Sequence, residues 1–329
     1  MNCKIREFIS NKYFLYSLIS IFILLTFFFI SIAYWFQHPQ KNNSTIILIQ
    51  KGASLSQITK ILTQQHLLNF PIYFKGILYG TGGWRQLKAG EYVIPPAVTP
   101  AQLIHILKSG NVILHPISLI EGETSYHLTQ RLGQDSRFDG ICEVSAEGSL
   151  LPETYHFPRG TARQKIVERM QASMQSLLTN VWAQRSSDHP LKTPQELVIL
   201  ASIIEKETSL SKERPIVAAV FLNRLKQGMP LQADPTIIYA LTKGERDLMR
   251  DLTREDLVFE SPYNTYLNLG LPPSPIANPG CDSLKAAANP ANVSYLYFVA
   301  DGTGGHIFAT SLEEHQKNHA HWRKVRDKR

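Results

Sequence analysis

Two acidic residues at the end of one apolar segment are the strongest candidates for chemistry in this sequence. The segment 193–208 begins with Thr-Pro-Gln-Glu, a capping box with proline at the first helical position, so a helix should start there. Apolar side chains cover most of its circumference, which predicts a central helix. On the helical wheel Glu207 lies about 40° from the mean apolar direction, and Glu205 more than about 100° from it. We therefore expect Glu207 to face inward.

An inward-facing carboxyl group is suited to acid–base catalysis. Aliphatic surroundings disfavour the charged form and raise the pKa, which would let Glu207 donate a proton near neutral pH. One alternative is an ordinary end-of-helix acid, paired with Lys206, Lys212 or Arg214. The other is that Glu205 is the acid, because the Glu-Lys-Glu triplet leaves the register open.

Several sequence blocks resemble one known family. ASIIEKET (201–208) and ERPIVAAVFLNRLKQGMPLQADPT (213–236) resemble the MltG (YceG-like) family of membrane-anchored endolytic murein transglycosylases. Four more blocks follow the order and spacing of that family: GSLLPETYHFP (148–158), SPYNTYLNLGLPPSPIANPG (261–280), DSLKAAANP (282–290) and YLYFVADGTGGHIF (295–308). The resemblance runs from about residue 45 to 320 and is strongest in the second half.

The resemblance implies a reaction and a residue for it. In that family one glutamate is both general acid and general base, and the Glu-Thr step at 207 and 208 looks like the Glu-Ser step of related lytic transglycosylases. The implied substrate is a peptidoglycan glycan strand, cut at the β-1,4 bond after N-acetylmuramic acid. The muramyl C6 hydroxyl attacks C1 and closes a 1,6-anhydro ring. One acid suffices and no cofactor is needed, because the substrate supplies its own nucleophile.

Two other functions stay open. Ordinary glycosidases use two carboxylates, and Asp234 would be the second one in a hydrolytic muramidase. Its alternative role is to cap the segment that Pro235 and Thr236 open. The alternative that is not an enzyme is a non-catalytic peptidoglycan-binding membrane tether. In such a tether Glu207 would only stabilise its helix.

The transition state of glycosidic cleavage also needs groups that hold the sugar ring and its N-acetyl group. Aromatic faces, amides and hydroxyls do this well. The candidates for substrate binding are Gln232, Asp234, Tyr239, Tyr263, Asn264, Thr265 and Tyr266. A polar loop with buried tyrosines would have the same pattern. The proline-rich run 271–280 excludes a regular helix or central strand and should form a rigid groove wall.

Length and composition limit the remaining possibilities. The 329 residues predict roughly two folded units, and 43% hydrophobic with 19% charged residues excludes a disordered chain. The net charge of +7 favours an anionic partner. The three cysteines have no zinc or thioredoxin spacing, and a pairing of Cys142 with Cys281 is left open. We expect no metal site from His315, His319 and His321, and no nucleic-acid partner for the basic run 323–329.

The first long apolar segment predicts a membrane anchor. Residues 13–36 contain no Asp, Glu, Lys or Arg, and 24 residues at about 1.5 Å each span the roughly 30 Å hydrocarbon core. The basic residues before it place the N-terminus, residues 1–12, in the cytoplasm and the rest beyond the membrane. The alternative is a cleaved signal peptide. We expect a single-pass protein of the cell inner membrane with a periplasmic catalytic domain.

A gapless repeat organises the next hundred residues. Ser54–Leu62, Thr99–Leu107 and Thr124–Leu132 each start with Ser or Thr and repeat Leu or Ile at helical spacing, which predicts three short helices. Strand-like runs lie between them at 45–50, 91–94 and 112–120. The stretch 45–97 resembles a LysM-type glycan-binding module, and a simple spacer is the alternative.

These elements predict an α+β protein in five parts. They are a cytoplasmic N-terminus (1–12), a transmembrane helix (13–36), a linker (37–44), a LysM-like module with connecting repeats (45–140) and a mixed α+β catalytic domain (141–329). The family resemblance also implies functional company with penicillin-binding synthases.

Overall fold

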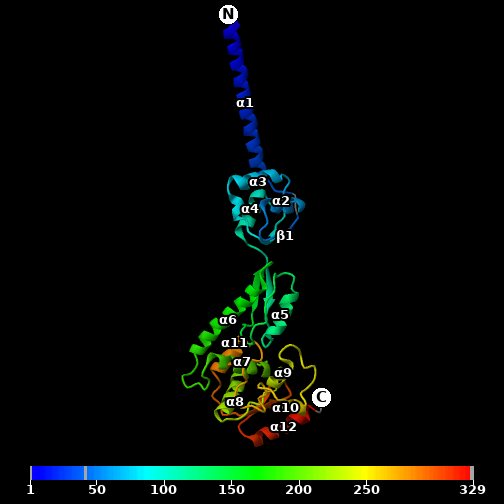
Figure 1. The fold of residues 1–329 in the computed structure, drawn as a ribbon, viewed down its shortest axis with the longest axis vertical. Helices are drawn as coiled ribbons and strands as arrows, with labels where there is room; N and C mark the ends of the chain where they lie inside the picture. The colour runs from blue at the N-terminus through cyan, green and yellow to red at the C-terminus, as the bar shows by residue number, and fades with distance from the viewer. Residues whose placement is uncertain (1, 41–42, 327–329) are drawn as a thin grey trace. The chain divides into compact units, whose positions relative to one another are not determined.

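The chain forms two compact units, which are described separately. The computed structural model describes residues 2–40 and 43–326 (Figure 1). The first unit contains residues 1–115 with 158–160, and the second contains 116–157 with 161–329. This division falls earlier than the expected boundary near 140. The reason is that the third repeat helix packs with later elements of the chain, through Leu128, Leu132 and Ile166.

The first unit joins a long apolar helix to a small α+β module. Helix α1 covers Asn2–Gln37, and its part Phe14–Gln37 is long and apolar enough to cross a membrane. Strands β1 (Thr45–Ile49) and β2 (Gly90–Ile94) pair antiparallel. The helical elements of the module are α2 (Leu55–Gln64), α3 (Pro71–Gly80), the 3-10 turn η1 (Gly83–Gln86) and α4 (Pro100–Ser109).

The predicted repeat helices are confirmed, because their local signals determine them. Ser54 and Thr99 each close a capping box with a glutamine three residues later. Thr124 caps the third helix, α5 (Ser125–Gln134), by accepting from the backbone N–H of His127. The apolar positions of the first two helices enter one core together with the inner faces of β1 and β2. Mixed helix and sheet content agrees with the predicted α+β class.

The second unit is mostly helical and contains two short two-stranded sheets. Strand β3 (Leu114–Ser118) pairs with β4 (Thr154–Pro158), and β5 (Tyr297–Ala300) pairs antiparallel with β6 (His306–Ala309). The helices after α5 are α6 (Arg163–Ala183), α7 (Pro194–Glu207), α8 (Arg214–Lys226), α9 (Asp234–Thr242), α10 (Arg254–Leu257), α11 (Cys281–Ala288) and α12 (Leu312–Arg326). The run 271–280 contains no regular element, as its prolines predict.

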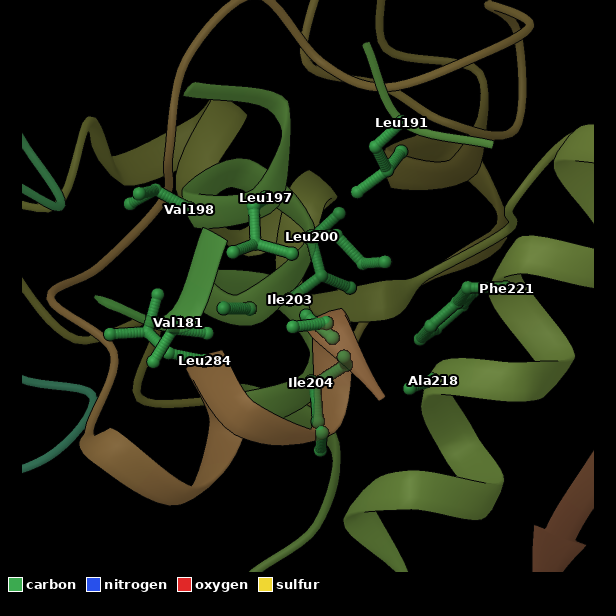
Figure 2. Close-up of a cluster of buried hydrophobic side chains, with 14 of the residues drawn as sticks. Val181, Leu191, Leu197, Val198, Leu200, Ile203, Ile204, Ala218, Phe221 and Leu284 are labelled. Atoms are coloured by element: carbon green, nitrogen blue, oxygen red, sulfur yellow. The ribbon is translucent and has the colours of Figure 1, made fainter. Parts of the chain in front are cut away.

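Helix α7 is the central element of this unit, as its composition predicts. Every residue from Leu197 to Ile204 is buried. Figure 2 shows Leu197, Leu200, Ile203 and Ile204 in one buried cluster with Ala218 and Phe221 of α8 and Leu284 of α11. Each fully buried aliphatic side chain contributes about 1.5–3 kcal/mol, so the position of the C-terminal end of α7 is strongly fixed. Cys142 and Cys281 are both free thiols.

Candidate active site

The end of α7 is held in place by a polar network. Thr208 is the C-cap of the helix, is almost fully buried, and donates from Oγ1 to Oε2 of Glu213 over 3.1 Å. The same carboxylate lies 2.7 Å from Nδ1 of His306 on β6. Its partners hold the pKa of Glu213 below that of an ordinary glutamate, although burial opposes them. The final turn of α7 therefore has little freedom to move.

Glu205 is buried and fully paired. Its side chain is only 3% exposed, Oε1 accepts from Nη2 of Arg214 at 2.7 Å, and Oε2 accepts from the backbone N–H of Gly280 at 2.8 Å. The expectation that Glu205 faces away from apolar surroundings is therefore wrong. A helical wheel describes one helix alone. In the fold, α7 is buried on all sides, and α8 supplies Arg214 on the side that carries Glu205. Glu205 ties α7 to α8 and to the start of α11.

Glu207 is partly buried and unpaired. Among the described residues, its carboxyl group has no hydrogen bond or ion pair, so the alternative of a pair with Arg214 is wrong: Arg214 pairs with Glu205 instead. Burial and, after it, the negative charge of Asp234 raise the pKa of Glu207 to about 8, while the Arg224 guanidinium opposes them. The direction is the one that its apolar surroundings predict. The position at a helix C-terminus also disfavours a carboxylate.

Arg224 is a buried cation beside this acid that the sequence patterns did not single out. Its Nε donates to the carbonyl of Leu296 at 2.6 Å, and its Nη1 donates to that of Leu231 at 2.8 Å. Burial lowers the pKa of Arg224, and negative charge on Glu207 acts in the opposite sense. The available signal was a basic residue close behind the apolar run 215–222 of α8. Because backbone carbonyls hold Arg224, it provides a fixed positive charge.

Asp234 and Tyr266 form a second pair near Glu207. The Tyr266 hydroxyl donates to Oδ1 of Asp234 at 2.6 Å, and burial followed by Asp234 raises the pKa of Tyr266, so the phenol stays protonated. Asp234 is exposed at the first turn of α9, whose N-cap is Ala233. The alternative role of Asp234 as a side-chain cap is thus wrong: α9 begins at Asp234 itself, and its carboxylate is bound to a tyrosine.

The other predicted binding residues divide into exposed and buried ones. Gln232 is exposed, has a left-handed backbone (φ 51°), and its Oε1 lies 3.5 Å from Nη1 of Arg224. Asn264 and Thr265 are completely buried. The amide of Asn264 donates to two backbone carbonyls of its own loop, while Oγ1 of Thr265 accepts from the N–H of Ala233 at 3.0 Å. These two residues hold the loop that carries Tyr266.

Tyr239 on α9 and Tyr263 in the loop after α10 lie together, apart from this charged group. Their ring centroids are 5.0 Å apart, and the Tyr263 hydroxyl lies 2.6 Å from Oγ of Ser274 in the proline-rich run. Burial raises the pKa of Tyr239, and negative charge on Glu147 adds to the effect. The structure therefore brings Glu207, Gln232, Asp234 and Tyr266 together around Arg224, with the tyrosine pair to one side.

A cavity of about 340 Å³ lies between the end of α7, the start of α5 and one side of α9. Lys206, Pro235 and Tyr239 line it, as do the basic side chain of Arg246 and the carboxylates of Glu121 and Glu123. Arg214 lies 3.3 Å from Glu121, and Arg131 lies 2.9 Å from Glu123, so both carboxylates are partly neutralised. Lys206 contributes to the lining of this cavity, whereas Glu207, Asp234 and Tyr266 do not, so the cavity adjoins the end of α7 without including the acid.

Glu147 is a second carboxyl group with altered acidity that sequence reasoning missed. Both of its oxygens accept from the backbone N–H of Ser125, each at 3.1 Å, at the first turn of α5. Burial raises the pKa of Glu147 to about 7, although these hydrogen bonds lower it. Its position at a helix N-terminus gives Glu147 a structural role in addition to its effect on Tyr239.

Comparisons with known proteins agree with these observations. The model of the YceG-like family matches residues 47–321. A protein named endolytic murein transglycosylase from Streptococcus pneumoniae serotype 2 (strain D39 / NCTC 7466) is 28% identical over 319 residues, covering 82% of this chain and 57% of the relative. The protein of the same name from Bacillus subtilis (strain 168) is 39% identical over 172 residues, covering 52% of this chain and 46% of the relative.

A solved structure is similar as well. The crystal structure of a putative yceG-like protein from Listeria monocytogenes is 29% identical, with a TM-score of 0.52, and the match covers 84% of this chain and 99% of that one. In contrast, the matches span only about half the length of the two named relatives.

Proposed function

This chain belongs to the YceG-like family, and from that membership we propose that it is an endolytic murein transglycosylase with Glu207 as its catalytic acid and base. The observation that carries the proposal is the contrast at the end of α7. Glu205 is neutralised by Arg214, whereas Glu207 has no partner among the described residues and a pKa of about 8. About nine in ten Glu207 side chains are then protonated at pH 7 and able to donate.

The proposed reaction needs one carboxyl group and no water. Protonated Glu207 gives its proton to the glycosidic oxygen, which leaves C1 of N-acetylmuramic acid with the electron pair of the broken bond. The resulting carboxylate takes the proton of the muramyl C6 hydroxyl while O6 bonds to C1. One product ends in 1,6-anhydromuramic acid, the other has a free hydroxyl at C4 of N-acetylglucosamine, and Glu207 is protonated again.

The surrounding groups fit the charges that develop in this reaction. Arg224 stabilises Glu207 in the moment when it is a carboxylate, because an opposite charge favours the ionised form. The carboxylate of Asp234 favours the positive charge of the oxocarbenium-like sugar. We assign binding of the ring and its N-acetyl group to Gln232 and the Tyr266 hydroxyl, and aromatic contacts to Tyr239 and Tyr263.

A hydrolytic muramidase is the second candidate, and one observation favours it. Asp234 lies close enough to Glu207 for its charge to raise the pKa of that acid, and a second carboxylate is what a hydrolase requires. The two reactions differ in their products. Hydrolysis leaves a reducing end into which water has entered, whereas transglycosylation leaves an anhydro end.

The test is to incubate the full-length protein with purified glycan strands and to identify the new ends by mass spectrometry. We expect anhydro ends within the strands, and a loss of about 10²–10⁴ in rate for Glu207→Gln. The matched control is Glu143→Gln, an exposed acid of the same unit, with normal activity expected. Reducing ends would support the muramidase. Strand binding without any cleavage would support a non-catalytic peptidoglycan-binding tether.

We further propose that α1 anchors the enzyme in the cell inner membrane, with the N-terminus in the cytoplasm and the catalytic unit in the periplasm. The uncharged segment and the basic residues before it support this orientation. The module at 45–97 is proposed to be a LysM-like glycan-binding module. Anchoring confines the enzyme to newly made strands near the membrane, and penicillin-binding synthases are the partners that the family resemblance suggests.

A further inference from the structure

Helix α3 has two apolar faces, of which only one belongs to the core of the module. Phe74 and Leu78 are buried in that core. On the outer side, Ile72 is 73% exposed and Tyr79, two helical turns later, is 58% exposed. Phe70, just before the helix, is 52% exposed. An apolar strip of this kind on a surface helix usually marks a contact with another apolar phase or partner.

The same helix packs against α1. The Tyr73 ring lies edge-on to Phe28, with centroids 6.0 Å apart, and to Trp35, with centroids 5.6 Å apart. Trp35 itself is part of the module core. The start of α3 is therefore fixed at the level of α1 that Phe28 and Trp35 occupy.

Phe28 lies inside the membrane-spanning segment of α1. A hydrocarbon core of about 30 Å takes about 20 helical residues, and the uncharged segment runs from 13 to 36. For every placement of 20 residues within it, Phe28 is at least four residues, or about 6 Å, inside the core boundary. Tyr73 contacts Phe28, and Phe70 stacks on Tyr73 with ring centroids 5.6 Å apart, so the start of α3 lies close to the membrane surface.

The charges in the sequence around α3 also favour contact with a lipid membrane. Residues 43–90 carry five Lys or Arg and no Asp or Glu. Arg85 lies over the ring of Trp84 at 5.2 Å, and that ring lies 6.3 Å from Tyr79. Tyrosine and tryptophan are typical of the membrane–water interface, and basic side chains bind anionic headgroups there.

We propose that the outer face of α3 and η1, formed by Phe70, Ile72, Tyr79, Trp84 and Arg85, is a second membrane contact that lies among anionic lipid headgroups beside α1. The occupant is lipid because this face continues the apolar surface of α1 at the same level. The proposal rests on the proposed anchoring by α1. The module would then contact the membrane through the outer face of α3 as well as through the transmembrane helix α1.

The experiment uses tryptophan fluorescence of the full-length protein in vesicles of phosphatidylcholine and phosphatidylglycerol whose acyl chains carry bromine near the headgroup. Ile72→Trp probes the proposed face. Val93→Trp is the matched control, because Val93 is 54% exposed on the outer side of β2, where its neighbours Tyr92 and Ile94 face the core. Phe22→Trp probes α1 itself. We expect brominated lipid to quench about half of the fluorescence that Ile72→Trp adds, and almost none of that from Val93→Trp.

The outcomes separate this proposal from the anchoring. Quenching of Phe22→Trp without quenching of Ile72→Trp would overturn the membrane contact and leave the anchor intact. No quenching of Phe22→Trp would overturn both. Tyr79→Trp provides a second probe on the same face if Ile72→Trp does not fold. Equal quenching of Ile72→Trp in vesicles of phosphatidylcholine alone would show that anionic headgroups are not required, against the proposal as stated.

Discussion

Replacing Glu207 with glutamine should stabilise the catalytic unit at alkaline pH. In the folded protein the pKa of this carboxyl group is about 8, against 4.5 for an ordinary glutamate. A factor of ten in proton affinity corresponds to 1.36 kcal/mol, so ionising Glu207 in place costs up to about 5 kcal/mol of folding free energy.

The sign follows from proton linkage. Below pH 4.5 both the folded and the unfolded protein hold this proton, and the wild type has its full stability. Between pH 4.5 and 8 the unfolded chain has released the proton but the folded one retains it, so stability falls as pH rises. Above pH 8 the folded protein carries the full cost of a buried charge. Glutamine never ionises, so Glu207→Gln lacks this loss.

The assay is urea unfolding at pH 5, 7 and 9, followed through Trp182, which packs against the core around α7. The other three tryptophans are replaced by phenylalanine, so that the first unit does not contribute to the signal. The exposed acid Glu143 supplies the control variant Glu143→Gln, which should behave like the wild type. If the free energies of unfolding of the wild type and Glu207→Gln run parallel from pH 5 to 9, burial does not raise this pKa, and the assignment of the acid loses its physical basis.

Three further predictions follow from the site. Glu205→Ala should lower the free energy of unfolding by about 3 kcal/mol in the same urea assay, because it leaves Arg214 without its closest partner; an unchanged value would contradict the structural role of this pair. The pH profile of kcat/KM for strand cleavage should fall above pH 8, and Asp234→Asn should move this limb to lower pH, because it removes the like charge that raises the pKa of Glu207. Tyr266→Phe should lower kcat/KM about tenfold while leaving the unfolding transition nearly unchanged, and normal cleavage would exclude Tyr266 from the site.

Local signals in the sequence predicted the elements well. Capping residues such as Ser54, Thr99 and Thr193 act on the backbone within three residues, so the helix starts need no tertiary information. The apolar composition of α7 correctly predicted a central helix. The same local reasoning identified Glu207 as an acid with a raised pKa.

Contacts between distant segments were not predictable in the same way. Arg224 acts at the site because the carbonyls of Leu231 and Leu296 hold it, and no pattern in α8 specifies those partners. Glu147 reaches α5 across 22 positions in the chain. Asn264 and Thr265 have the polar side chains of a binding loop, but their hydrogen bonds are satisfied inside the protein. Residue type gives the chemistry, and only the fold decides which polar groups remain available.

The two glutamates at the end of α7 show how the fold makes that choice. Residues two positions apart on a helix do not share a face, so Glu205 and Glu207 meet different neighbours. Glu205 meets Arg214 and the N–H of Gly280, and its buried pair is costly to break, which fixes the helix end. Glu207 meets apolar surface and a carboxylate, while the nearby cation of Arg224 is held by carbonyls. A catalytic acid needs this exclusion from ion pairs, because a bound cation would lower its pKa, and the buried pair two residues away fixes the helix end that carries Glu207.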